Sequence, residues 1–324
     1  MDKRKTQDLS LRCFASITVK KVDWLWHPFI PYGKVTIIQG DPGDGKTTLI
    51  LNIAALLSNG LPMPDADDDN TDSIKTIYQS AEDGIADTIK PRLMSAGADC
   101  SKIAFIDEGE ETLTLNDPRI ESAINKMGAR LLVLDPLQAY LGENAEMNRA
   151  DGIRPIMKHL AAVAERTGCA IIIIGHMNKA GGSKGIYRGL GSIDITAVAR
   201  SVLLVGRVKS NPSIRVMAQL KNNLAPEGTS FAFEINDNSS VRWIGEYDIT
   251  AEELLLGDDI AEDGGKLTET MEALNVTLQS GEIACTNIYE QLRKAGVSKR
   301  TIDSAKKNLG IKSVKRADGW YWSL

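Results

Sequence analysis

The residues from Gly40 to Thr47 have the types and the spacing needed to hold a phosphate group. They read Gly-Asp-Pro-Gly-Asp-Gly-Lys-Thr and match the pattern G-x-x-x-x-G-K-[ST]. Glycines let backbone N–H groups face the phosphates, and the N-terminus of a following helix adds partial positive charge. Lys46 would neutralise charge on the β- and γ-phosphates, and Thr47 offers a hydroxyl ligand to Mg²⁺. The predicted contacts to Mg-ATP are Gly40, Asp41, Pro42, Gly43, Asp44, Gly45, Lys46, Thr47 and Thr48.

Carboxylates close two predicted strands further along the chain. Asp135 follows the apolar run Leu131–Leu134. In proteins with this phosphate loop, an acid at the end of such a strand holds the ligand shell of the magnesium ion. Glu82 closes the run after the phosphate loop, where a carboxylate can polarise the water that attacks the γ-phosphate. Asp83 is the alternative base, and a solvated strand-end acid is the alternative role for Glu82.

A histidine and a basic glycine-rich segment come next. The run 171–174 leads through Gly175 to His176, at the edge of the sheet where ligands of open α/β sheets bind. We expect His176 to sense the γ-phosphate, and a packed or capping histidine is the alternative. The segment 177–191 is rich in glycine and carries Lys179, Lys184 and Arg188. Flexible backbone with positive charge suits a loop that binds the phosphates of a nucleic-acid strand. A disordered surface loop is the alternative.

The elements that must position these residues alternate between strands and helices. Strands are predicted at 35–39, 74–79, 103–106, 131–134 and 170–174, and helices at 47–58, 85–96, 117–127 and 153–167. Continuous apolar strands in this alternation predict an α/β fold, a mostly parallel sheet with helices on both faces. The shorter strands 202–207, 213–220, 229–235 and 241–244 are expected to extend this sheet in antiparallel fashion.

The sequence predicts an ATPase domain over 1–247, an acidic linker over 248–265 and a small domain over 266–324. The linker is acidic because residues 248–263 hold seven Asp/Glu and no Lys/Arg. The last segment has the pattern helix, helix, helix, hairpin, which is that of a winged helix-turn-helix. The expected DNA contacts on or near its recognition helix are Lys299, Arg300, Lys306 and Lys307.

Charge and composition favour the same division. The chain has 324 residues and a net charge of −5, but residues 286–324 carry nine Lys/Arg against three Asp/Glu. This net of +6 leaves −11 on the rest, and a basic tail on an acidic body indicates nucleic-acid contact by the tail. No apolar run approaches the ~20 residues that cross a bilayer, and no apolar segment follows the basic N-terminus. With scattered cysteines, these features predict a cytoplasmic protein without membrane contact.

Together, in this order, the motifs resemble the RecA/DnaB superfamily of ring-forming ATPases. Within it, the likeness is closest to the plasmid replicative helicase RepA and to related phage and mobile-element AAA-type ATPases. The markers are Trp24-Leu-Trp26 with Pro31-Tyr-Gly-Lys34, Tyr78-Gln-Ser-Ala-Glu82-Asp83, Leu134-Asp135-Pro136-Leu137, and Gly168-Cys-Ala170 leading to Gly175-His176. The segment 189–205, with Ala199-Arg200-Ser201, completes the set. The resemblance covers about residues 24–244 and implies a RecA-like fold.

The resemblance also implies roles for single residues. Glu82 would be the catalytic base and His176 the sensor, and 177–189 would be a DNA-facing loop. Residues 140–151 would form another such loop, although they hold more acid than base. A neighbouring subunit of a ring, with a hexamer favoured, would supply a cation in trans. Lys221 matches the lysine of a K-x-R or K-x-K finger motif whose second position here is Asn223, so Arg200 or Arg207 would complete the site.

Two classes of function remain open from the sequence. The first is a motor, a hexameric helicase or translocase driven by ATP along single-stranded DNA. The second is an ATP-switched DNA-binding protein, a regulator or loader that binds duplex without unwinding it. Strand displacement would identify the first class, and sequence-specific duplex binding without unwinding would identify the second.

Overall fold

The computed structural model describes residue 11 and residues 13–64, 72–142, 150–177, 193–209, 211–256, 261–279, 281–297, 299–316 and 319–323. Among the helices of these residues, none combines the length and the apolar character needed to span a membrane.

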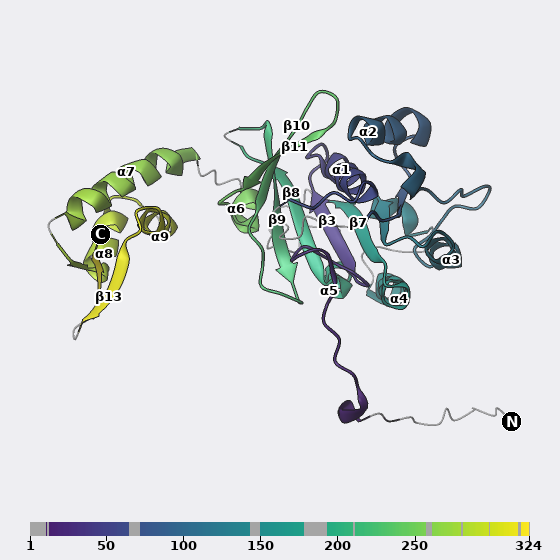
Figure 1. Ribbon diagram of the computed structural model, residues 1–324, viewed down its shortest axis with the longest axis horizontal. Helices are drawn as coiled ribbons and strands as arrows, with labels where there is room; N and C mark the ends of the chain where they lie inside the picture. The colour runs from purple at the N-terminus through teal and green to yellow at the C-terminus, as the bar shows by residue number, and fades with distance from the viewer. Residues whose placement is uncertain are drawn as a thin grey trace.

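A mixed sheet organises the first part of the chain (Figure 1). Within the described residues it has nine strands in the order β11-β10-β9-β8-β3-β7-β6-β4-β5. Its parallel strands are β3 (Val35–Gly40), β4 (Thr76–Ser80), β5 (Ile103–Ala104), β6 (Leu131–Asp135), β7 (Ala170–His176) and β8 (Ser201–Arg207). The antiparallel strands are β9 (Ile214–Asn222), β10 (Phe231–Ile235) and β11 (Val241–Glu246). The predicted α/β fold with a mostly parallel sheet is confirmed.

One detail of the predicted sheet is wrong. Strand β8 pairs in parallel with β3, so the antiparallel extension begins at β9 and not at residue 202. The physical reason is burial, because residues 201–205 are buried throughout, as expected for a strand covered on both faces.

Helices cover both faces of the sheet because its central strands are apolar on both sides. Side chains alternate between two cores along each strand: Ile38 and Val133 belong to one core, Ile37 and Leu132 to the other. The first core is closed by α1 (Lys46–Ser58) and α2 (Lys90–Ser95), and the second by α3 (Pro118–Met127), α4 (Ala150–Thr167) and α5 (Ile193–Val198). Shorter helical turns lie at Phe14–Ser16, Ile85–Ile89, Cys100–Lys102 and Leu137–Tyr140.

An aromatic cluster ties the N-terminal part of the chain to the antiparallel strands. A small hairpin of β1 (Trp24–Trp26) and β2 (Ile30–Pro31) was not predicted from the sequence. Trp26 from this hairpin is buried, and its ring lies 5.9 Å from those of Phe231 and Trp243. The Trp26–Trp243 contact is edge-on and the Trp26–Phe231 contact is tilted, and together they attach β10 and β11 to the β1–β2 hairpin.

The C-terminal part of the chain has a core of its own. Its elements are α6 (Ala251–Leu256), α7 (Ala261–Leu278), β12 (Ile283–Ala284), α8 (Cys285–Lys294), α9 (Lys299–Asn308), β13 (Lys312–Arg316) and β14 (Gly319–Ser323). Helix α6 packs on the sheet through Leu254, whereas Leu274, Ile288, Ile302 and Trp322 form a separate cluster between α7 and β14. Strands β12, β14 and β13 make a three-stranded antiparallel sheet. Two helices, α6 and the start of α7, therefore occupy much of the predicted 248–265 linker.

Candidate nucleotide-binding site

The phosphate loop runs from the end of β3 to the start of α1, and its glycines are required by contact. A Cβ on Gly40 would lie 2.1 Å from the carbonyl oxygen of Val205, a distance that no side chain tolerates. Gly45, the N-cap of α1, has φ 92° in the left-handed region, and a Cβ there would lie 2.5 Å from Ile235. The chain therefore turns tightly into the helix, whose N-terminal N–H groups can face a phosphate. Within the loop, the N–H of Asp41 donates to Oδ2 of Asp44 at 3.0 Å.

Lys46 is buried in the concave side of this loop. Its Nζ donates hydrogen bonds to the carbonyl oxygens of Gly40 at 2.9 Å and Asp41 at 2.8 Å. Burial lowers the pKa of Lys46, and the nearby Asp44 carboxylate opposes that shift. Burial raises the pKa of Asp44 in turn, against the attraction of Lys46. The lysine thus stands among carbonyl oxygens that phosphate oxygens of a nucleotide can replace.

One carboxylate oxygen of Asp135 accepts hydrogen bonds from both Thr47 and Tyr78. The hydroxyls of Thr47 and Tyr78 each donate a hydrogen bond of 2.7 Å to Oδ2 of Asp135. Asp135 is 6% exposed, and burial raises its pKa while the two hydrogen bonds oppose the shift. Burial followed by the Asp135 charge raises the pKa of Tyr78 well above its usual range, so the phenol stays a donor.

These atoms fit a magnesium ion bound together with a nucleotide. Mg²⁺ prefers oxygen ligands and keeps several waters, so proteins usually supply one or two ligands beside the phosphates. The Thr47 hydroxyl and the Asp135 carboxylate are two such oxygens at the mouth of the phosphate loop. When bound, the ion would neutralise phosphate charge, and Tyr78 would keep Asp135 in its orientation.

Glu82 and His176 face each other at the same edge of the sheet. Nε2 of His176 lies 3.8 Å from Oε2 of Glu82, and His176 stands beside Gly40 in the β3–β7 register. Glu82 is 66% exposed at its side chain, so water reaches it. Asp83, the alternative base, is bound to Arg92 of α2 at 2.9 Å. Of the two acids, the geometry favours Glu82 for contact with a water near the phosphate loop.

Arg207 contacts the phosphate loop of its own chain. At the end of β8, its Nη2 donates to the carbonyl oxygen of Gly43 at 2.6 Å, and its Nε lies 3.4 Å from Oδ1 of Asp44. Its cross-strand partner is Arg215, whose Cδ approaches Gly45. Burial and then the Arg207 charge lower the pKa of Arg215. Two like charges directly opposite each other destabilise a strand pair. An anion bound between Arg207 and Arg215 would reduce this repulsion.

Lys221 and Arg200 lie at the opposite edge of the sheet. Lys221 pairs with Val202 at the start of β8, and the amide of Arg200 donates to the carbonyl of Val35 at the start of β3. Strand β3 spans about 16 Å from Val35 to the phosphate loop, and Val202, the partner of Lys221, pairs with Ile37 in its middle. Nζ of Lys221 donates to the carbonyls of Thr196 at 2.8 Å and Ala199 at 3.0 Å, beside the end of α5. Burial and then Arg200 lower the pKa of Lys221.

The predicted nucleic-acid contacts fall into two groups. Lys179, Lys184 and Arg188 lie outside the described residues. Lys299, Arg300, Lys306 and Lys307 all lie on α9. Of these, Lys306 is held by the C-terminal hairpin, because its Nζ donates to Ser313 at 2.6 Å and stands 4.6 Å from the Trp322 ring centroid.

Sequence reasoning missed Tyr78 and Arg215 as site residues. A tyrosine inside the predicted strand before Glu82 is a signal for Tyr78, because a buried phenol needs a hydrogen-bond partner. The signal for Arg215 is weaker: the Asn211-Pro212 turn sets a hairpin whose register decides which residue faces Arg207.

Comparison with known proteins now identifies the family. The AAA domain family AAA_25 matches residues 3–182, more than half of the chain. The chain belongs to this family. With its parallel sheet and phosphate loop, it is a P-loop ATPase of the RecA superfamily, as the sequence predicted.

Several curated relatives carry the name DNA repair protein RadA. The chain is 24% identical to that of Bacillus subtilis (strain 168) over 244 residues, which cover 74% of this chain and 46% of the relative. It is 22% identical to that of Streptococcus pneumoniae (strain ATCC BAA-255 / R6), over 83% of this chain and 59% of the relative. The chain thus spans about half the length of these relatives. A specific likeness to RepA stays a prediction.

Among solved structures, a KaiC-like protein from Pyrococcus horikoshii OT3 is similar, with a TM-score of 0.49 and 18% identity. The match covers 69% of this chain and 97% of that one.

The hydrogen bond from Tyr78 to Oδ2 of Asp135 can be tested with the substitution Tyr78→Phe. The variant keeps the buried ring but removes one hydrogen bond to a carboxylate, worth about 1.5–3 kcal/mol. We expect the Mg²⁺ concentration for half-maximal ATP turnover to rise about 3- to 30-fold. Tyr140→Phe is the matched control, since its buried hydroxyl has no hydrogen-bond partner among the described residues. An unchanged Mg²⁺ requirement in Tyr78→Phe would show that this hydrogen bond does not orient Asp135.

Proposed function

We propose that this chain is a ring-forming ATPase motor that acts on DNA, hydrolysing Mg-ATP to move along or unwind a strand. One observation supports it above the others: Lys46, the Thr47–Asp135 pair and the Glu82–His176 pair meet at one edge of the sheet. This arrangement would hold a triphosphate, a metal and an attacking water side by side. The RadA relatives, named for DNA repair, support DNA as the partner.

In the proposed reaction, a water attacks the γ-phosphorus and the bond to the β–γ bridging oxygen breaks. Glu82 is solvent-exposed and accepts the proton of that water. Lys46 offsets negative charge on the β- and γ-phosphates, because its ammonium group is held in the concave side of the loop. His176, in contact range of Glu82, links the base to the state of the γ-phosphate. Arg207 acts in cis, beside Gly43.

The substitution Glu82→Gln tests this assignment. It removes the proton acceptor but keeps the size of the side chain, so ATP should still bind while turnover falls by about 10²–10⁴. Asp83→Asn is the control, since Asp83 is engaged with Arg92 and should affect turnover little. Single-turnover kinetics with a parallel nucleotide-binding assay separate the two effects. Full turnover in Glu82→Gln would show that Glu82 is not the general base and would favour Asp83 instead.

We further propose that Lys221 serves the active site of a neighbouring subunit. By register it lies level with Ile37, three residues or about 10 Å along the strand direction before Gly40. Its Nζ is bound by the carbonyls of Thr196 and Ala199, which precede β8 at the far end from its own phosphate loop. A ring would place this edge of the sheet against the next nucleotide. The alternative is a structural lysine that satisfies carbonyls beside the end of α5, as its two hydrogen bonds do.

Mixing two inactive variants distinguishes these roles. In a mixture of Lys221→Ala and Glu82→Gln subunits, some interfaces combine an intact Glu82 with an intact Lys221 from the neighbour. A finger in trans is worth about 10³–10⁵ in rate, so activity should reappear on mixing. No recovery, with Lys221→Ala inactive alone, would point to the structural role. Full activity of Lys221→Ala alone would move the finger to Arg200.

We propose that residues 266–324 form a winged helix-turn-helix that binds duplex DNA. The order α7, β12, α8, α9 and the β13–β14 hairpin supports it, as does the net charge of +6 over 286–324. Its separate core means that its removal leaves the sheet intact.

Deletion of residues 266–324 should therefore leave basal ATP turnover nearly unchanged. Duplex affinity should fall and its salt dependence should flatten, because fewer counterions are released. Fluorescence anisotropy at several salt concentrations measures both. Unchanged duplex affinity would make the unit a protein-docking module. If the full chain binds a specific duplex but displaces no strand, the ATP-switched regulator replaces the motor.

A further inference from the structure

The C-terminal hairpin exposes a tryptophan beside one that is buried. Trp322 is 2% exposed and fills the core of the C-terminal unit, whereas Trp320 on the same strand is 51% exposed. Residues two apart on a strand point to the same face, so Trp320 continues the face that carries Trp322 beyond the core. An indole with half its surface in water, on an ordered strand, is a large apolar group that its own core does not use.

Positive charge accompanies the exposed ring. Lys315 is the cross-strand partner of Trp320, and its Nζ lies 5.9 Å from the ring centroid. The other basic residue near the hairpin turn, Arg316, is engaged by Glu282 through contacts of 2.7–3.0 Å. Among the described residues, no carboxylate pairs with Lys315. Within the described residues, the hairpin therefore presents an aromatic surface with a lysine next to it that no carboxylate pairs with.

This combination fits the face of an unpaired nucleobase. In a duplex, base faces are covered by neighbouring bases and only the edges are open in the grooves. An indole can stack on a base face where the strand is single. A cation beside it then meets the adjoining phosphate. An aromatic–lysine pair that only stabilises the hairpin is the alternative.

We propose that the β13–β14 hairpin binds the junction between duplex and single strand, with a base stacked on Trp320 and the next phosphate at Lys315. The proposal rests on the proposed DNA-binding role of the C-terminal unit. It assigns the hairpin a ligand that α9 alone would not select, namely DNA with unpaired bases.

The test compares full-length variants on three DNAs: a blunt duplex, the same duplex with a single-stranded overhang, and the single strand. Trp320→Leu keeps an apolar side chain but removes the stacking face. We expect its affinity for the overhang DNA to fall about 5- to 100-fold, with blunt-duplex affinity changed less than about 2-fold. Trp320→Phe should retain most of the binding. ATP turnover and far-UV circular dichroism equal to those of the unmodified chain establish that each variant is folded.

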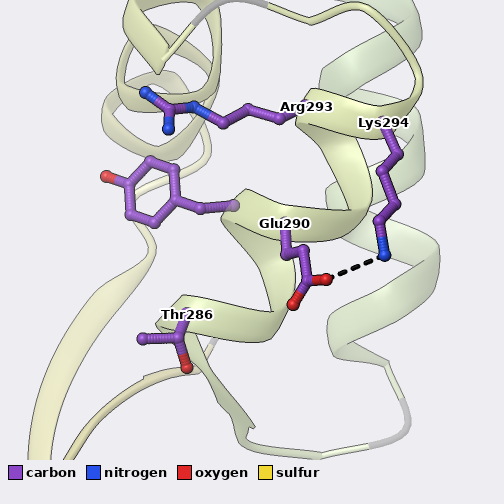
Figure 2. A pocket seen from close by; sticks show the side chains of 5 residues that line it. Thr286, Glu290, Arg293 and Lys294 are labelled. Atoms are coloured by element: carbon purple, nitrogen blue, oxygen red, sulfur yellow. Dashed lines mark hydrogen bonds and ion pairs between the residues drawn. The ribbon is translucent and has the colours of Figure 1, made fainter.

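Lysine variants provide the matched comparison. Lys315→Ala should lower the slope of log affinity against log salt for overhang DNA by about 0.7, one phosphate contact. Lys294→Ala should leave this salt slope unchanged, since the Lys294 Nζ is paired with the Glu290 carboxylate at 2.8 Å (Figure 2). Both residues line a pocket of about 590 Å³ on α8.

Two results would overturn the proposal: Trp320→Leu binding overhang DNA as tightly as the unmodified chain, or losing affinity equally for blunt duplex. If deletion of 266–324 lowers duplex affinity while Trp320→Leu changes nothing, the stacking site fails and the DNA-binding unit stands. If the deletion itself leaves DNA binding unchanged, both fail.

Discussion

The hydrogen bond between Thr47 and Asp135 joins the two halves of the nucleotide site. It connects the first turn of α1 to the end of β6, 88 residues further along the chain. A hydroxyl and a carboxylate 2.7 Å apart can serve one metal only if the register of the sheet brings the end of β6 close to the start of α1. The parallel register from β3 through β7 to β6 places Asp135 level with Ile38, two residues before the end of β3, and the apolar residues on both faces of those strands stabilise the register.

Burial gives this site its electrostatic character. Lys46, Asp135 and Tyr78 are all largely withdrawn from water, and burial is the largest cause of each of their pKa shifts. The lowered pKa of Lys46 and the raised pKa of Asp135 both mean that burial disfavours the ammonium and the carboxylate, so each charged form needs hydrogen-bond or ionic partners. Thr47 and Tyr78 supply hydrogen bonds to Asp135 within the chain, and a nucleotide with its metal would supply the remaining counter-charges.

The local parts of the site were predictable from sequence because they depend on local rules. The glycine-rich loop, the strand before it and α1 after it all lie where the pattern placed them, since a backbone contact at Gly40 and the left-handed φ of Gly45 both require glycine. The parts that were missed depend on register and distance. Arg207 faces Arg215 only through the pairing of β8 with β9, and Asp83 is engaged by Arg92 only through the packing of α2. The role proposed for Lys221 involves a neighbouring subunit, and its own chain shows only its hydrogen bonds to Thr196 and Ala199.

The central claim is that the loop from Gly40 to Thr47 binds a magnesium-bound nucleoside triphosphate. Calorimetric titration of the full chain and of Lys46→Ala with a non-hydrolysable ATP analogue, with and without Mg²⁺, tests it directly. We predict saturable binding to the unmodified chain that Mg²⁺ strengthens, and a loss of at least about 10-fold in Lys46→Ala, the worth of about 1.4 kcal/mol. Equal affinity of the two proteins, or no binding to either, would contradict the account.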